Sequence, residues 1–175
     1  PQVQAAVLEC ARGGILREGL GFDRCSVAVV TNVGTGDHLG LNHIHTVEGI
    51  ARVKKVIVQN VAPSGYAVLN AADPLVAAMA DECPGQVIYF ARDSHHPRIA
   101  SHRARGRRVV FVEKGDVVAV EGKVQHRLPL SSVPITHGGA IGFQVENTLA
   151  AVAACWGLNM AWADIVQGVS TFVSD

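Results

Sequence analysis

Short apolar runs rich in β-branched residues alternate with longer helical patterns along the first half of the chain. Four of these runs predict strands, each bounded by glycine, proline or polar residues: 5–9 (AAVLE), 26–31 (SVAVVT), 66–70 (YAVLN) and 86–90 (QVIYF). Their near-continuous apolar character indicates burial on both faces, as in a parallel sheet covered by helices. The pattern therefore predicts an α/β domain with a mostly parallel sheet flanked by helices.

The pattern changes in the second half of the chain. Residues 108–123 (RVVFVEKGDVVAVEGK) form two alternating runs around Lys114-Gly115-Asp116, which predicts a small β-hairpin. The segment that leads into it, 92–108 (RDSHHPRIASHRARGRR), is polar and basic. We expect this segment to be an exposed excursion from the sheet.

Three further patterns predict helices. Asp73-Pro74 combines an N-cap acceptor with a proline at the first helical position, and Cys83-Pro84-Gly85 ends that helix. A second helix is expected from about Val145 and a third from near Thr46. The apolar face of the second helix contains Leu149, Val152 and Trp156.

The helix expected near Thr46 carries a lysine on its apolar stripe. The stripe contains Val47, Ile50, Ala51 and Val58, and Lys54 falls seven residues after Val47 on the same side. A lysine in this position either extends along its apolar stem to reach water or serves a buried site. Spacing alone leaves both interpretations open.

Length and charge limit the class of protein. A chain of 175 residues is long enough for one domain with a substantial core, so we interpret 1–175 as a single α/β domain. Fifteen basic residues face fifteen acidic ones, and no apolar run approaches the roughly 20 residues that cross a bilayer. We therefore expect neither a nucleic acid nor a membrane as partner, but small molecules or protein.

The four cysteines, Cys10, Cys25, Cys83 and Cys155, lie far apart in the sequence, with no C-x-x-C pair and no secretory signal. We expect them to be reduced and mostly buried, in a cytoplasmic protein.

Two predicted strands end at residues that can take part in chemistry. Glu9 closes AAVLE, and the glycine-rich stretch TNVGTGDHLG, residues 31–40, places Asp37 and His38 after SVAVVT. Ligands of open α/β sheets bind at the carboxyl ends of strands, so Glu9, His38 and Lys54 can converge there. In the alternative interpretation, Glu9 caps a turn, His38 packs against the sheet and Lys54 is solvated.

Metal binding has two interpretations. His38, His43 and His45 suggest zinc, but their spacing fits no helical H-x-x-x-H site and no cysteine pair completes a tetrahedron. Mg²⁺ at Glu9 and His38 is favoured, because carboxylate and water oxygens suit this ion. No G-x-x-x-x-G-K-[ST] phosphate loop occurs, and the stretch ARGGILREGLG is interpreted as a turn.

Four stretches together resemble a known family. The sequences VLECARGGILREGLGFDRC, TNVGTGDHLG, ARVKKVIVQNVAPSGYAVLNAADPLVAAMA and FQVENTLAAVAA, in this order, are similar to the Mur-ligase-like module of the cyanophycin synthetases. The resemblance extends from Val7 to Phe172 and is weakest within 94–108. ARGGILREGLGFDRC is specific to these synthetases, whereas DHL, NAADP and FQVEN also occur in ligases of peptidoglycan and polyglutamate synthesis.

The resemblance implies an ATP-dependent amide ligase that activates a carboxylate as an acyl phosphate. In cyanophycin synthetases the module is associated with joining arginine to the β-carboxylate of a poly-aspartate backbone. Carried over, Glu9 and His38 are Mg²⁺ ligands and, with Lys54, the catalytic residues; Lys54 matches a lysine that is carbamylated in many relatives. Asn70, Asp73 and Asn147 border the adenine and ribose of ATP, and Asn32 joins them as a cofactor-binding residue.

The chain also departs from the family pattern. The upstream phosphate loop and the C-terminal domain are missing, and Ala72 replaces the second acid of NADD. We therefore expect a truncated central ATP-binding domain that folds alone but neither binds ATP tightly nor catalyses a reaction. Its expected partners are ATP, arginine, a poly-aspartate or cyanophycin primer, the remainder of the synthetase chain and further copies in a homo-oligomer.

Two alternatives remain open from the sequence. One is a peptidoglycan or folylpolyglutamate-type ligase with an amino-acid substrate other than arginine. The other is a catalytically silent domain that keeps the sheet and binds a nucleotide or a protein partner.

Overall fold

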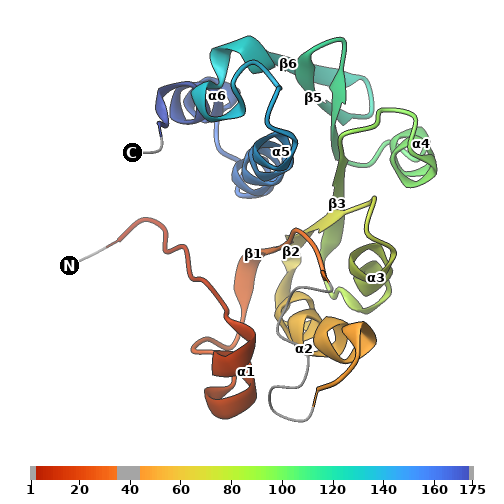
Figure 1. Cartoon of the computed structure of the whole chain (residues 1–175), viewed down its shortest axis with the longest axis vertical. Helices are drawn as coiled ribbons and strands as arrows, with labels where there is room; N and C mark the ends of the chain where they lie inside the picture. Colours follow the sequence, from red (N-terminus) through yellow and green to blue (C-terminus); the bar gives the residue numbers. More distant parts are fainter. Residues whose placement is uncertain (1–2, 35–43, 174–175) are drawn as a thin grey trace.

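A computed structural model describes residues 3–34 and 44–173, which form a six-stranded sheet between two layers of helices (Figure 1). The strands follow one another across the sheet in chain order, β1 to β6. The first four run parallel, and β5 and β6 are antiparallel to their neighbours. The predicted α/β fold with a mostly parallel sheet is confirmed.

The strand bounds are β1 (Cys25–Val30), β2 (Val61–Asn70), β3 (Gln86–Ala91), β4 (Val109–Glu113), β5 (Asp116–Glu121) and β6 (Val124–Pro129). Three of the four strands predicted in the first half of the chain are present as β1, β2 and β3. The predicted hairpin is also confirmed, as β4 and β5. Its turn uses Lys114 and Gly115 with φ of 53° and 82°, as a two-residue type I′ connection requires.

The helix bounds are α1 (Arg12–Glu18), α2 (Val47–Gln59), α3 (Pro74–Ala77), α4 (Pro97–Ala104), α5 (Gly142–Gly157) and α6 (Trp162–Thr171). Short 3-10 turns follow at 78–82, 130–132 and 134–136. The predicted start of α2 is confirmed, because the Thr46 hydroxyl accepts a hydrogen bond from the Gly49 amide at 3.0 Å. Helix α5 begins three residues before the predicted Val145.

Each face of the sheet has its own hydrophobic core. Helices α2, α3 and α4 cover one face and α5 and α6 the other (Figure 1). Adjacent residues of β2 point into opposite cores, and Val68 and Leu69 are both fully buried. The central strands are therefore buried on both faces, as their apolar runs predicted. The apolar face expected for α5 is also confirmed by the burial of Leu149, Val152 and Trp156.

The strand predicted at residues 5–9 is wrong. This segment makes no ladder and is exposed along its length, with Val7 97% and Leu8 62% accessible. A strand needs a hydrogen-bonded neighbour, and no described residue pairs with β1 on the side away from β2. Strand β1 is accordingly half exposed, not buried on both faces.

Sequence patterns missed α1, α4 and β6. Helix α4 lies inside the segment expected to be an exposed excursion, and it is anchored by one fully buried side chain, Ile99. Strand β6 buries only Leu128, so its sequence lacks a strong apolar alternation. The four cysteines are free, as expected, but each is only partly buried. Among the residues that the structure describes, no helix is both long and apolar enough to cross a bilayer.

Candidate functional site at the carboxyl edge of the sheet

Asn70, the last residue of β2, holds the loop that follows β1. Its side-chain amide donates to the carbonyl oxygen of Thr31 at 2.9 Å, and its side-chain oxygen accepts from the Ala72 amide at 2.9 Å. Asn70 is buried. Asn70 therefore joins the ends of two neighbouring parallel strands.

Asp73 holds the same loop from the start of α3. One carboxylate oxygen accepts from the Val33 amide at 2.7 Å. The other accepts from the Leu75 and Val76 amides at 2.9 and 3.1 Å, which makes Asp73 the N-cap predicted for this helix. Three backbone donors on two elements share one carboxylate.

Lys54 reaches the loop from the helical layer. Its ammonium group donates to the carbonyl oxygen of Asn32 at 3.1 Å. The residue is partly buried, and its stem runs from α2 toward the carboxyl end of β1. This is the edge at which the sequence analysis allowed Glu9, His38 and Lys54 to converge. We call Lys54, Asn70, Asp73 and the loop 31–33 the carboxyl-edge cluster.

Within the carboxyl-edge cluster, the side chains hold the backbone of the loop 31–33. Both polar groups of Asn70 and both oxygens of Asp73 already bond to backbone atoms. Their arrangement fixes the path of 31–33, the segment that leads to Asp37 and His38. Asp37, His38 and His43 lie outside the described residues.

Glu9, Asn32 and Lys54 line one cavity of about 750 Å³ that runs along β1. Glu9 is exposed and belongs to no strand, so it reaches this cavity from an extended segment and not from a sheet edge as predicted. Carboxylate and amide oxygens are ligands that Mg²⁺ accepts, so the donor chemistry fits this ion. Within 3–34 and 44–173, no group of three or more His, Cys, Asp or Glu side chains forms a metal site.

Asn147 lines a different cavity from Lys54 and Asn32. It is on α5, where its side-chain amide donates to the Gln144 side-chain oxygen at 3.2 Å. This cavity of about 400 Å³ is lined by Gln144, Thr148 and Ala151 of α5, by Gly168 and Val169 of α6, and by Ile135 and Phe172. Asn147 thus lies on a helix, whereas Asn70 ends β2 and Asp73 caps α3, and its contact with a nucleotide stays a prediction.

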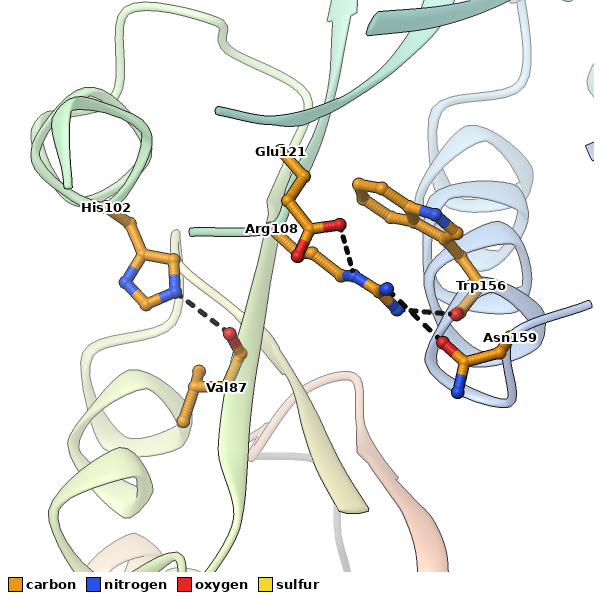
Figure 2. Close-up of polar contacts among 6 residues, drawn as sticks. All are labelled: Val87, His102, Arg108, Glu121, Trp156 and Asn159. Carbon is orange, nitrogen blue, oxygen red and sulfur yellow. Dashed lines mark hydrogen bonds and ion pairs between the residues drawn. The ribbon is translucent and has the colours of Figure 1, made fainter. Parts of the chain in front are cut away.

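A partly buried arginine, Arg108, at the opposite, amino edge of the sheet has no counterpart in the sequence predictions (Figure 2). Arg108 donates to the Glu121 carboxylate at 3.0 Å, to the Trp156 carbonyl at 2.8 Å and to the Asn159 side-chain oxygen at 3.3 Å. Its guanidinium carbon lies 4.8 Å from the centre of the Tyr66 ring and 4.7 Å from that of Trp156. We call these five residues the Arg108 cluster.

The Arg108 cluster connects the hairpin to the end of α5. A cation bonded to the last carbonyls of a helix also interacts favourably with the helix dipole. Only about 13% of the Arg108 side chain is exposed. No apolar or helical periodicity signals such a contact, because it depends on residues 48 positions apart in the sequence.

His102 anchors α4 to β3 near the same edge (Figure 2). Its Nε2 lies 2.9 Å from the Val87 carbonyl oxygen, and its ring packs edge-on against Tyr89 with centroids 4.9 Å apart. Burial is the main cause that lowers the pKa of His102 below its usual value. The neutral imidazole therefore acts as a structural contact here.

Comparison with known families identifies the domain. Residues 1–155 match the family described as the Mur ligase middle domain. The chain belongs to this family. Membership agrees with the parallel sheet and with the carboxyl-edge location of the cluster, where α/β proteins bind their ligands.

Curated relatives narrow the resemblance. The chain is 48% identical over 175 residues to the cyanophycin synthetase of Synechocystis sp., covering 99% of this chain and 20% of that protein. It is 47% identical over 173 residues to the cyanophycin synthetase of Crocosphaera subtropica, covering 98% of this chain and 20% of the relative. The chain thus spans about a fifth of the length of these proteins.

More distant matches share the fold. A crystal structure of MurF from Acinetobacter baumannii superposes with a TM-score of 0.58 at 22% identity, covering 86% of this chain and 29% of that one. The UDP-N-acetylmuramoylalanine--D-glutamate ligase of Desulfitobacterium hafniense is 29% identical over 149 residues, covering 85% of this chain and 29% of the relative. The relatives named here are ligases or synthetases.

Proposed function

We propose that this chain is the middle module of a cytoplasmic, ATP-dependent ligase that joins arginine to the β-carboxylate of a poly-aspartate backbone. The observation that carries the proposal is the 48% identity to a cyanophycin synthetase across almost the whole chain. Identity to the peptidoglycan ligase of Desulfitobacterium hafniense is 29%.

The proposed reaction has two steps. A carboxylate oxygen of the acceptor attacks the γ-phosphorus of ATP and ADP leaves, which forms an acyl phosphate. The amine of arginine then attacks the acyl carbon, phosphate leaves with the bonding electrons and the amine releases a proton. Both steps depend mainly on positioning and on charge that offsets the phosphate oxygens.

The catalytic roles proposed for Glu9, His38 and Lys54 follow the family pattern. Glu9 and His38 would hold Mg²⁺, which neutralises charge on the transferred phosphoryl group. Lys54 would act at the carboxyl end of β1, either through its ammonium group or as a carbamate that contributes to metal binding. The bond from Lys54 to the Asn32 carbonyl supports this location.

The geometry changes the roles that we propose for the four residues expected to contact ATP. Asn70 and Asp73 would act mainly by holding 31–33 in place, because their polar atoms bond to backbone. Asn32 and Asn147 are the exposed amides of the set. Without a phosphate loop, a few neutral hydrogen bonds of about 0.5–1.5 kcal/mol each give at best weak affinity for ATP. The 175-residue chain alone would therefore be inactive.

The test uses the full-length protein with ATP, Mg²⁺, arginine and an oligo-aspartate primer. We expect arginine to be incorporated with release of ADP, and muramyl peptides to give no product in place of the primer. Ligation only with muramyl or folate acceptors would favour the peptidoglycan or polyglutamate alternative. ATP binding without ligation to any acceptor would favour the silent domain.

A further inference from the structure

The segment 92–108 is strongly basic, although the chain as a whole has a formal net charge of zero. It contains six of the fifteen Lys and Arg residues but one of the fifteen Asp and Glu residues. The other 158 residues therefore carry nine basic and fourteen acidic side chains. The net charge of zero is therefore the sum of a strongly basic segment and an acidic remainder.

The fold presents this segment as one surface. It leaves the sheet after Ala91, at the carboxyl end of β3, and returns to the amino end of β4 at Val109. Helix α4 spans about 12 Å of the path between these two ends, at 1.5 Å per residue. The segment therefore extends from the proposed reaction edge to the opposite edge of the sheet, on the outside of β3 and β4 (Figure 1).

The surface has a fixed backbone and exposed cations. Ile99 is fully buried beneath α4, and His102 is bonded to the Val87 carbonyl, so the helix is anchored. The turn at Gly106 packs against Gly122, which places the β5–β6 turn beside it. The exposed arginines of α4 and the turn after it are Arg98, Arg103, Arg105 and Arg107; Arg92 is also exposed, but its guanidinium lies against Gly142 at the start of α5.

These arginines are not neutralised by neighbouring acids. The hairpin carboxylates Glu113, Asp116 and Glu121 pair with Arg127 and Arg108. Among residues 3–34 and 44–173, no ion pair involves any of the five exposed arginines. Their charge is therefore available to a partner.

We propose that the segment 92–108 is a docking surface for an acidic peptide, the carboxylate-rich acceptor of the ligation reaction. This inference rests on the proposed function. Planar guanidinium groups bind carboxylates with two parallel hydrogen bonds, and a row of them suits an extended chain with a carboxylate on each residue. The surface starts at the reaction edge, so an acceptor lying along it has one end near the carboxyl-edge cluster.

Sequence chemistry favours a peptide over a nucleic acid. The segment contains no Phe, Tyr or Trp on which bases could stack. The rings that its arginines contact are Phe111 under Arg103 and Tyr66 and Trp156 beside Arg108; they are 1%, 8% and 7% accessible, so none is open to a base. Carboxylates need no stacking partner.

The experiment uses the full-length protein with Arg105→Gln and Arg107→Gln combined. These side chains flank Gly106 at the exposed end of the segment, away from the proposed reaction edge. The matched control combines Arg52→Gln and Lys114→Gln, which removes two exposed charges from α2 and the hairpin turn. Binding of a fluorescein-labelled oligo-aspartate peptide is followed by anisotropy at low and moderate salt.

We expect the Arg105/Arg107 variant to raise the Kd for the peptide about fivefold and to weaken its salt dependence, since exposed ion pairs contribute modestly and are screened. The control variant should bind like the wild type. Equal affinity in wild type and the Arg105/Arg107 variant overturns the proposal. So does an oligonucleotide that binds more tightly than the peptide and loses affinity in the same variant.

Steady-state kinetics tests the docking surface separately from the proposed ligase activity. In the ligation assay, the Arg105/Arg107 variant should raise the KM for the primer and leave kcat and the KM values for ATP and arginine unchanged. Ligation with an unchanged primer KM refutes the docking surface while the function stands. No ligation by the wild type, together with peptide binding that depends on these arginines, refutes the function while the surface stands.

Discussion

The two edges of the sheet use similar polar contacts for different purposes. At the carboxyl edge, Lys54, Asn70 and Asp73 bond to backbone atoms of a short loop. At the amino edge, Arg108 bonds to the end of α5 between two aromatic rings. The first set fixes a segment that leads to candidate catalytic residues, whereas the second joins two elements of the core.

The difference lies in what surrounds the polar groups. Tyr66 and Trp156, which flank Arg108, are 8% and 7% exposed, so its bonds to Glu121 and the Trp156 carbonyl are partly shielded from water, whereas its bond to Asn159 is exposed. The bond from Lys54 to Asn32 is exposed, and it borders an open cavity. Shielded contacts contribute more to stability, and exposed polar groups beside a cavity remain available to a ligand. The comparison therefore predicts that loss of Lys54 affects mainly activity and loss of Arg108 mainly stability.

Lys54→Ala should have the largest effect. In the full-length protein we expect ligation to fall about a hundredfold or more, because misplacing the loop that leads to His38 disturbs the reacting groups. Thermal unfolding should change little, since the bond from Lys54 to the Asn32 carbonyl is exposed. Lys55→Ala is the control, because Lys55 is the next residue of α2 and pairs with Glu82 instead. Wild-type turnover in Lys54→Ala would show that Lys54 takes no part in the reaction and is simply solvated.

Arg108→Ala should destabilise the domain by about 2 kcal/mol, since it removes charge-assisted hydrogen bonds and cation-π contacts together. Urea unfolding measures this effect. Arg127→Ala is the comparison variant, because Arg127 pairs with two hairpin carboxylates but is more exposed. Its effect should be clearly smaller, and equal effects would show that shielding by the two rings contributes nothing.

Asp73→Ala should cost about 1–2 kcal/mol through loss of the N-cap of α3. Thr46→Ala, which removes a single cap bond from α2, should cost about 1 kcal/mol. Asp73 also holds the Val33 amide, so hydrogen exchange at Val33 should accelerate in Asp73→Ala and remain slow in Thr46→Ala. Unchanged exchange at Val33 would separate Asp73 from the loop.

The smallest expected effect concerns pH and His102. Burial lowers its pKa in the folded protein below the ordinary value of 6.5. The unfolded chain therefore takes up a proton first as pH falls through about 6.5, so stability decreases below that pH until folded His102 also protonates. His102→Gln should flatten this part of the profile, measured by urea unfolding at several pH values. A profile that stays as steep as that of the wild type would assign the pH dependence to other groups.

Much of the fold was predictable because apolar periodicity reports burial. Strand β3 and the second half of β2 are covered on both faces, and their apolar runs predict strands, whereas the partly exposed first half of β2, residues 61–65, was not predicted. The apolar run at 5–9 was misleading, since hydrophobicity shows that a strand can be buried but not whether a neighbour is present to pair with it. Helix α4 and strand β6 bury one side chain each, too few to produce a period.

The candidate site was partly predictable. The position of Lys54 on the α2 stripe and the cap signal of Asp73 are local, and both are found where the sequence placed them. The use of Asn70 and Asp73 to hold 31–33 depends on residues 39 and 40 positions away, which no local pattern reveals. The Arg108 cluster was missed for the same reason.

The central claim is that the carboxyl edge serves the reaction and the amino edge serves the fold. The most direct test is the ligation rate per folded molecule in full-length Lys54→Ala and Arg108→Ala, measured side by side at a temperature where both are folded. We predict that Lys54→Ala retains about 1% of the wild-type rate or less, and that Arg108→Ala stays within about twofold of wild type despite its lower stability. A rate lost equally in both variants, or lost only in Arg108→Ala, would contradict the account.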